Sequence, residues 1–312
     1  MNKEKSFVSA VVYIHNDGNR VKDFLGMLVG VLENNFEHSE IICVNDFSTD
    51  NGPALIREVA NTAKTTTVSV LNMSYFHGKE MAMNAGIDLA IGDFVFEFDY
   101  TLVDFEESLI MDVYRKSLEG FDIVSASPNR KMSLYSKVFY KMYDHFTKVS
   151  SGLNAETFRI LSRRVINRID AMNKTTSYRK AVYAACGLKT TVLKYDVLPI
   201  VVKRKTPKIE KKYNRGLAID SLILFTNVGY TFSKFMTVLM MLSTIAMTLY
   251  VILVNIASNP IEGWTTTILF LSFVFFGLFA VLTVIIKYLQ IIVDLVFKRK
   301  TYSFESIEKL TK

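Results

Sequence analysis

The chain has 312 residues, a length that fits one large domain or two modest ones. Its two cysteines, Cys43 and Cys186, lie in apolar surroundings, as reduced core thiols do, and its four histidines lack metal-ligand spacing. The net charge of +7 comes largely from basic residues that flank the apolar C-terminal part, with no nucleic-acid recognition motif beside them. We therefore expect neither a zinc site nor a nucleic-acid partner.

The first half of the chain alternates between strand and helix patterns. Short apolar runs predict strands, and apolar residues at three- and four-residue spacing predict the helices between them. The order predicts an α/β fold with a mostly parallel, doubly wound sheet, whose ligand site lies outside the carboxyl ends of the strands. The expected strands are residues 7–14, 41–44, 67–71, 94–98 and 122–126, the expected helices are residues 21–32, 53–61 and 79–91, and residues 183–198 return to strand-like alternation.

Two familiar phosphate-binding motifs are missing from this alternating pattern. Neither GxGxxG nor GxxxxGK[ST] occurs in the sequence. Dinucleotide and P-loop chemistry are therefore not supported, and no arrangement typical of a Ser-His-Asp or Cys-His nucleophile can be picked out either.

The fourth expected strand runs directly into acidic side chains. Its sequence from residue 92 to residue 107 is GDFVFEFDYTLVDFEE, with carboxylates at Glu97, Asp99, Asp104, Glu106 and Glu107. A strand that ends in carboxylates is where an α/β protein would hold a cation or a sugar-nucleotide. The same pattern fits a core strand followed by an acid-rich first helical turn, because Asp and Glu favour helix N-termini. Both interpretations stay open at this point.

The sequence changes character near residue 202. Two uncharged runs, residues 235–258 and 263–286, are each long enough to cross a bilayer, which takes about 20 residues. They predict a tight transmembrane hairpin, with two buried core helices as the alternative. The expected organisation is a soluble domain at residues 1–202, a basic linker with an amphipathic surface helix at 203–234, the hairpin with its extension at 235–297, and a tail at 298–312.

Basic residues around these two runs predict an orientation. They precede the first run and follow the second, and the connecting loop has none. The positive-inside rule then puts the large domain and both termini in the cytoplasm. The same basic clusters would attract anionic headgroups, so the lipid bilayer is an expected partner.

Six motifs in a fixed order resemble one enzyme family. They are VVYIHNDGN, EIICVNDFSTD, SYFHGKEMAMNAGIDLAIGDFVFEFD, TFRILSRR, a basic Lys-Tyr segment, and two apolar runs that end in KYLQIIVDLVFKRKTY. The order resembles family 2 glycosyltransferases that act on polyisoprenyl phosphate, such as bactoprenol glucosyltransferases and dolichol-phosphate mannose synthases. The resemblance implies a GT-A fold, a UDP- or GDP-sugar donor, Mg²⁺ or Mn²⁺, and inverting transfer to polyprenyl (undecaprenyl) phosphate at the cytoplasmic face of a bacterial inner membrane.

The same resemblance implies roles for individual residues. Asp99 matches the first aspartate of the family's Asp-x-Asp motif and Asp104 a later aspartate, which makes both of them metal-ligand candidates; Glu97 is kept in reserve. The implied catalytic residues are Asp99, Asp104 and Arg159. The implied donor-binding residues are Asp17, Asp46, Gly78, Lys79 and Asp99. The implied acceptor-phosphate residues are Arg204, Lys212 and Tyr213.

Several positions depart from the family pattern. Thr101 stands where the second, metal-binding aspartate belongs, and Thr157 replaces the aspartate before Phe-Arg. Tyr75 replaces an arginine and Ile209 a glycine. These departures keep a second hypothesis open, in which a relative without turnover binds donor or serves as a scaffold. A homo-oligomer is also possible.

Overall fold

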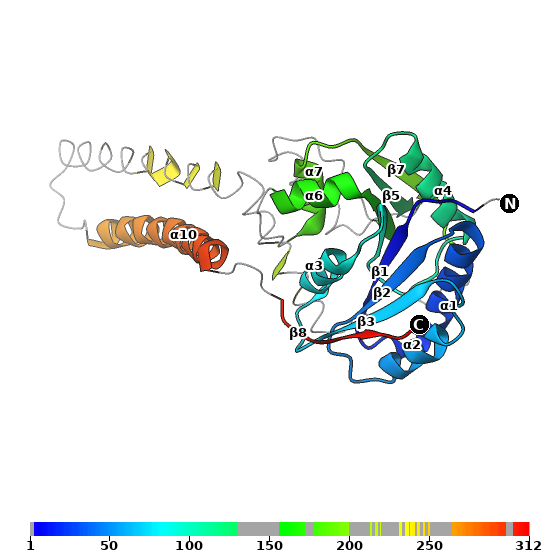
Figure 1. Cartoon of the computed structure of the whole chain (residues 1–312). Helices are drawn as coiled ribbons and strands as arrows, with labels where there is room; N and C mark the ends of the chain where they lie inside the picture. Colours follow the sequence, from blue (N-terminus) through cyan, green and yellow to red (C-terminus); the bar gives the residue numbers. More distant parts are fainter. Residues whose placement is uncertain are drawn as a thin grey trace. The chain divides into compact units, whose positions relative to one another are not determined.

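A computed structural model describes residues 3–129, 156–171, 178–199, 264–297 and 302–311, with isolated positions between 213 and 249. An eight-stranded sheet is the centre of the fold, in the order β7-β5-β6-β4-β1-β2-β3-β8 (Figure 1). Its strands are β1 (Val8–Ile14), β2 (Ser39–Asn45), β3 (Thr67–Met73), β4 (Phe94–Phe98), β5 (Ile123–Pro128), β6 (Phe158–Ser162), β7 (Thr190–Tyr195) and β8 (Phe304–Lys309).

Helices separate most of these strands along the chain. The parallel pairs are β1 with β2, β1 with β4, β2 with β3 and β5 with β7, whereas β6 and β8 run antiparallel to their neighbours. The predicted mostly parallel α/β sheet is therefore confirmed. The helices are α1 (Gly18–Asn35), α2 (Gly52–Ala60), α3 (Lys79–Leu89), α4 (Ser108–Leu118), α6 (Arg163–Ala171), α7 (Arg179–Ala185) and α10 (Trp264–Phe297).

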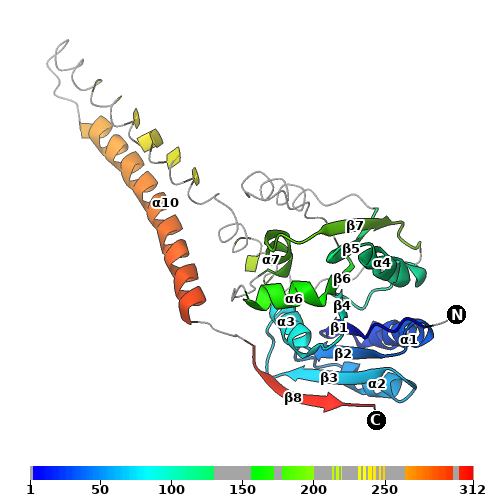
Figure 2. The same cartoon turned by 45° about the horizontal axis from the view of Figure 1, so that its top comes forward.

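Each face of the sheet has its own apolar core. Successive side chains of a strand point to opposite faces, so β1 contributes Val12 to one core and Val11 to the other. The first core also contains Phe24 of α1 and Ile110 of α4, and the second contains Ala82 of α3 and residues of α6 and α7. Figure 2 shows the sheet between these two helix layers.

The middle of the sheet brings three strand ends together. β1 lies between β2 and β4 and is parallel to both. Their carboxyl ends are therefore neighbours, and each continues into a polar segment that begins at His15, Asp46 or Asp99. A crevice outside the carboxyl ends of parallel strands is the usual ligand site of this architecture.

One region differs from the predicted alternation. Residues 183–198 form a strand only from Thr190 to Tyr195, because Tyr183 lies in the helix α7. Between β4 and β5, the structure places β6, antiparallel to both. β6 follows β5 in the chain but lies between β4 and β5 in the sheet. Local sequence patterns cannot predict this position.

The predicted location in a membrane is contradicted, and the predicted transmembrane hairpin is not confirmed. In the described ranges, no helix is long and apolar enough to cross a membrane, a passage that takes about 20 apolar residues. This finding overturns the location of a multi-pass inner-membrane protein with cytoplasmic termini. Most of the first predicted span, 235–258, lies outside the described residues, and α10 covers nearly all of the second, 263–286.

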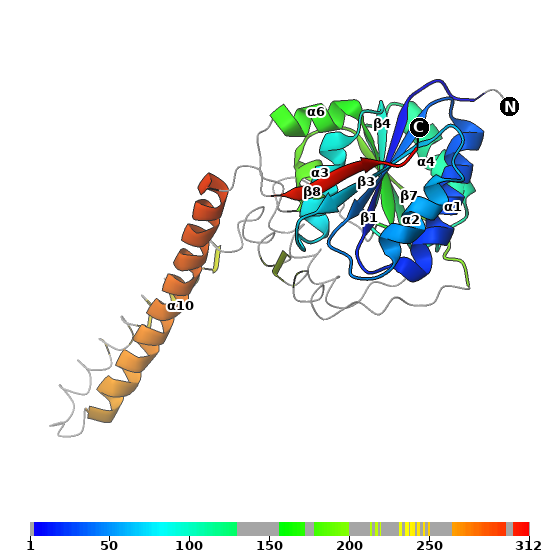
Figure 3. The same cartoon turned by 60° about the horizontal axis from the view of Figure 1, so that its bottom comes forward.

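The C-terminal residues complete the sheet edge. β8 pairs antiparallel with β3 at one edge of the sheet (Figure 3). Leu71 lies opposite Ile307, and the Arg57 guanidinium lies 2.8 Å from the Glu308 carboxylate. Residues 302–311 were expected to be part of a tail. Instead, β8 covers the backbone edge of β3, which would otherwise be open to pairing with another chain.

Removal of residues 302–312 should destabilise the domain and expose β3. We expect the melting temperature to fall by about 5 °C and self-association to increase, because ladder hydrogen bonds are lost at an unprotected edge. Differential scanning fluorimetry and light scattering measure both effects, with removal of Lys312 alone as the control. An unchanged melting temperature and particle size after the longer deletion would contradict the role of β8.

Candidate functional site

Asp46, directly after β2, anchors the loop that leads into α3. Its buried carboxylate accepts hydrogen bonds from the backbone N–H groups of His77 (2.8 Å) and Gly78 (2.9 Å) and from the Tyr13 hydroxyl (3.0 Å). Burial raises the pKa of Asp46, and these hydrogen bonds oppose that rise. Asp46 therefore fixes the position of the Gly78-Lys79 turn relative to β2.

Gly78 is required where this loop enters the helix. Its φ of +83° favours glycine, and a Cβ atom there would lie 2.4 Å from the Tyr213 ring. The Tyr213 ring also makes an edge contact with Phe76 at a centroid distance of 6.3 Å. One residue of the predicted acceptor segment thus lies against the predicted donor loop.

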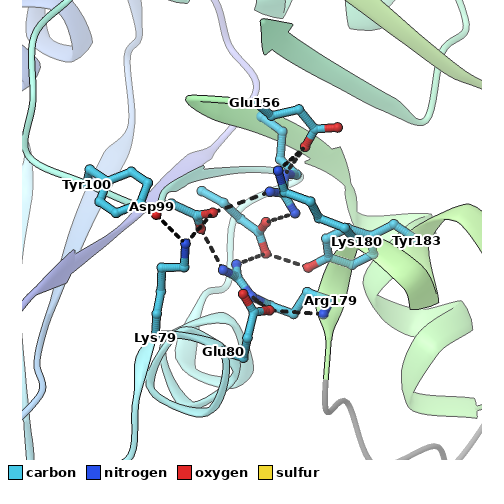
Figure 4. A network of polar contacts seen from close by, with 10 residues as sticks. Lys79, Glu80, Asp99, Tyr100, Glu156, Arg179, Lys180 and Tyr183 are labelled. Atoms are coloured by element: carbon cyan, nitrogen blue, oxygen red, sulfur yellow. Dashed lines mark hydrogen bonds and ion pairs between the residues drawn. The ribbon is translucent and has the colours of Figure 1, made fainter. Parts of the chain in front are cut away.

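Asp99, at the end of β4, faces three protein cations. Its Oδ1 lies 2.5 Å from Nη2 of Arg179, and its Oδ2 lies 3.4 Å from Nζ of Lys79 and 3.6 Å from Nη2 of Arg159 (Figure 4). Lys79 also donates a hydrogen bond to the Tyr100 hydroxyl at 2.9 Å. Both oxygens of Asp99 are therefore engaged by positive groups.

Arg179 joins α7 to β4 and α3. Its Nη1 lies 3.0 Å from Glu97, and its Nε and backbone N–H donate to Glu80 at 3.1 and 3.0 Å. Glu97 also accepts a hydrogen bond from the Tyr183 hydroxyl and lies directly opposite Arg159 in the β4–β6 pair, 3.2 Å from its guanidinium. All of these side chains are buried, so they depend on one another for charge compensation.

A further carboxylate balances the charge of the group. Glu156 lies 3.2 Å from Nε of Arg159 and 3.7 Å from Nζ of Lys180. Among the described residues, four carboxylates and four cations then form what we call the β4 ion network, and the formal charges of these eight groups cancel. Its members are Glu80, Glu97, Asp99, Glu156, Lys79, Arg159, Arg179 and Lys180.

The network shifts the pKa values of its members in opposite directions. Burial alone would raise the pKa of Asp99, but Lys79, Arg179 and Arg159 outweigh it and hold that pKa well below its usual value. Burial would lower the pKa of Lys79, and attraction by Asp99, Tyr100 and Glu80 raises it instead. Asp99 and Lys79 are therefore both charged at neutral pH.

Asp104 belongs to a separate hydrogen-bonded group. Its carboxylate accepts a hydrogen bond from the Tyr195 hydroxyl at 2.7 Å, and that hydroxyl lies 2.5 Å from Oγ1 of Thr157. Asp104 is buried, and its backbone oxygen accepts from the N–H of Leu198 at 3.1 Å. Thr157, at a position where the family has an aspartate, thus supports Tyr195 beside Asp104.

Thr101 is buried against the loop that follows β1. Its hydroxyl donates a hydrogen bond to Asp17, whose carboxylate also lies 3.6 Å from Arg20. A threonine supplies no negative charge here, whereas Mg²⁺ and Mn²⁺ favour carboxylate oxygens. Within the described ranges, no group of three or more His, Cys, Asp or Glu side chains could hold a metal ion. As arranged, the residues around Asp99 do not fit a divalent cation.

Some of the predicted site residues contact one another in the structure, and others do not. Asp46, Gly78 and Lys79 meet at the start of α3, and Lys79 and Arg159 meet at Asp99. Asp17 contacts Thr101, while Asp104 belongs to the Tyr195 group. Arg204 and Lys212 lie outside the described residues.

Sequence reasoning missed Arg179 and its partner Glu80. The only signal was an Arg-Lys pair directly before the apolar run AVYAAC, a place where charge is unexpected unless it is paired. Glu80 looked like an ordinary acid in a first helical turn. Their partnership depends on α3 and α7 packing near β4, which no local pattern encodes.

The sequence pattern of glycosyl transferase family 2 matches residues 9–170, just over half of the chain. The chain is a member of glycosyl transferase family 2. The match includes the strand ends after β1, β2 and β4 and also Arg159, whereas Arg179 lies beyond it. The family resemblance inferred from the sequence is confirmed, and so is the assignment of the chain to the glycosyltransferases.

Individual relatives agree with this assignment. An uncharacterized glycosyltransferase of Synechocystis is 29% identical over 225 residues, 70% of this chain and 69% of that protein. A prophage bactoprenol glucosyl transferase homolog of Escherichia coli is 27% identical over 194 residues, 60% of this chain. The match spans 62% of that homolog, which is less than two thirds of its length.

A solved structure agrees with the fold. Glucosyl-3-phosphoglycerate synthase from Mycobacterium tuberculosis, in complex with Mn²⁺, UDP-glucose and phosphoglyceric acid, aligns with a TM-score of 0.51 at 13% identity. The alignment covers 70% of this chain and 79% of that one. This likeness concerns the fold alone, and together with the family match it identifies a GT-A type α/β domain.

Arg179→Met should destabilise the protein strongly. The substitution leaves Glu80, Glu97 and Asp99 with too few buried counter-charges, so we expect the free energy of unfolding to fall by about 3–5 kcal/mol. Urea denaturation measures the change. The matched control is Arg115→Met, which removes an exposed ion pair to Asp112 and should cost less than about 1 kcal/mol. Equal losses in the two variants would refute the buried network.

The stabilising effect of Asp99 should disappear in acid. Because its folded-state pKa lies below the unfolded value of about 3.9, its contribution is fully present above that value and is lost as pH falls through the folded pKa. The difference in free energy of unfolding between wild type and Asp99→Asn should therefore be constant from neutral pH to about pH 5 and shrink below about pH 4. A difference that stays the same or grows in acid would argue against this pairing.

Proposed function

We propose that this protein transfers one sugar from a UDP- or GDP-sugar to a polyprenyl phosphate, with inversion at the anomeric carbon. The observation that carries the proposal is the meeting of Asp46, Lys79 and Asp99 beside the carboxyl ends of β2 and β4 in a family 2 chain. Asp46 would contact the donor base and Lys79 its diphosphate. The prophage bactoprenol glucosyl transferase homolog supports a polyprenyl phosphate acceptor.

The acceptor assignment has support within the fold. Tyr213 packs on Gly78, so one residue proposed to bind the acceptor phosphate lies against the loop proposed to bind the donor. Arg204 and Lys212 are proposed to bind the phosphate with Tyr213. An arginine fork matches phosphate geometry, and a lysine provides a point charge.

The transfer reaction needs little assistance from a general base. A phosphate oxygen of the acceptor attacks the anomeric carbon, the bond from that carbon to the donor diphosphate breaks, and the nucleoside diphosphate leaves. A phosphate monoester has a second pKa of about 6, so the nucleophile is already largely ionised at neutral pH. The larger demand is to stabilise charge on the leaving diphosphate. Lys79, held by Asp99, is the side chain we assign to it.

A second candidate function is donor binding or scaffolding without turnover. Thr101 and Thr157 replace family aspartates, and both hydroxyl groups take part in hydrogen bonds within the described structure. Replacing both with aspartate separates the two candidates. A large gain of transfer over an inactive parent would support the second candidate, whereas an active parent excludes it.

Transfer of labelled sugar to polyprenyl phosphate tests the proposal directly. We expect transfer by the wild type and a loss of about 100-fold in Asp99→Asn, because Lys79 loses the carboxylate that orients it. The control is Asp112→Asn, an exposed carboxylate on α4, which should keep full activity. Equal transfer by wild type and Asp99→Asn would remove Asp99 from the mechanism, and no transfer from any donor would contradict the enzymatic function.

A further inference from the structure

Asp99 is surrounded by three cationic side chains, which disfavours its use as a ligand for a metal ion. Arg179, Lys79 and Arg159 lie 2.5, 3.4 and 3.6 Å from its two oxygens. A divalent ion on the same carboxylate would meet these three cations at short range in a buried site, where charge repulsion is weakly screened. The formal charges of the β4 ion network already cancel, so a divalent ion on Asp99 would be balanced by the donor diphosphate alone and not by the protein groups around it.

The Thr101 position is consistent with a site built without a metal. The Thr101 hydroxyl donates to the Asp17 carboxylate. An ionised aspartate at position 101 could only accept hydrogen bonds, so it would repel Asp17 unless a cation lay between them. Threonine donates to Asp17 without adding a negative charge, and Arg20 lies 3.6 Å from the same carboxylate. Threonine at this position therefore removes a ligand and adds no negative charge that a metal ion would have to balance.

Lys79 differs from the other two cations in its access to solvent. Its side chain is 16% exposed, compared with 2% for Arg159 and 1% for Arg179. An ammonium group has three N–H donors; within the described structure Lys79 donates a hydrogen bond to Tyr100, and Asp99 lies 3.4 Å away as its ion-pair partner. A further N–H is available to a phosphate oxygen, while Asp99 and Tyr100 hold the ammonium in place.

We propose that this chain binds the diphosphate of its donor without a divalent metal ion, and that the Lys79 ammonium, held by Asp99, provides the charge in its place. This inference rests on the proposed function, since it concerns the same nucleotide-sugar. It differs from the metal use implied by the family resemblance. Asp99 then acts as a positioning residue that orients a protein cation.

The first test compares donor binding with and without metal. The purified full chain is titrated with UDP-glucose and with GDP-mannose, first in EDTA and then in Mn²⁺, and the dissociation constant is measured by calorimetry and by the donor-dependent rise in melting temperature. We expect at least one donor to bind equally well in both conditions. Binding that requires Mn²⁺ overturns this inference and leaves the proposed function intact. Absence of binding in both conditions overturns the two together.

The second test concerns Lys79 itself. Lys79→Gln removes the charge and keeps a hydrogen-bond donor, so donor affinity in EDTA should fall by about 10-fold or more. Lys79→Arg, which keeps the charge, should retain more affinity than Lys79→Gln. The matched control is Lys22→Gln, at an exposed pair with Glu58 on the outer helices, which should bind like wild type.

The outcomes of this second test are distinct. A folded Lys79→Gln variant that binds donor as well as wild type overturns the role of Lys79. Recovery of its affinity by Mn²⁺, to the wild-type value, would show that a metal can bind at Asp99 and would also count against the inference. If the variant does not fold, the comparison of wild type in EDTA and in Mn²⁺ still decides whether a metal is required.

Discussion

The Asp99 carboxylate and the three cations around it tie the central strands to the helices that cover one face of the sheet. Asp99 and Glu97 come from β4, Lys79 and Glu80 from α3, Arg159 from β6 and Arg179 from α7. Buried charges are stable only when they are paired, so each of these elements must dock for the others to be satisfied. The same docking brings the Gly78-Lys79 turn to the strand end where a donor would bind.

The framework of the fold could be predicted because its signals are local. Alternating apolar runs and helical periodicity identified β1 to β5 and the helices α1, α2 and α3, but not α4, and the polar ends of β2 and β4 indicated where a ligand would bind. β6 and β8 were not predicted, because they pair with strands that are distant from them in the chain. Phe158–Ser162 inserts between β4 and β5, and Phe304–Lys309 returns to β3.

The site could be predicted only in part, for a related physical reason. Family motifs pointed to Asp46, Lys79, Asp99 and Arg159, which the structure brings to the same side of the sheet. They could not reveal that Asp99 already faces three cations, because Arg179 contributes from a helix about 80 residues later in the chain. A motif with a missing aspartate suggests a weakened metal site. The geometry indicates instead a site whose charge is balanced by protein groups.

A crystal structure of the full chain, grown with nucleoside diphosphate and Mn²⁺ and recorded at an energy where manganese scatters anomalously, tests this account most directly. The account predicts the Nζ atom of Lys79 within hydrogen-bonding distance of a diphosphate oxygen, and no anomalous peak between Asp99 and the diphosphate. An anomalous peak at that position, with Asp99 as a ligand and Lys79 displaced from it, would contradict the account.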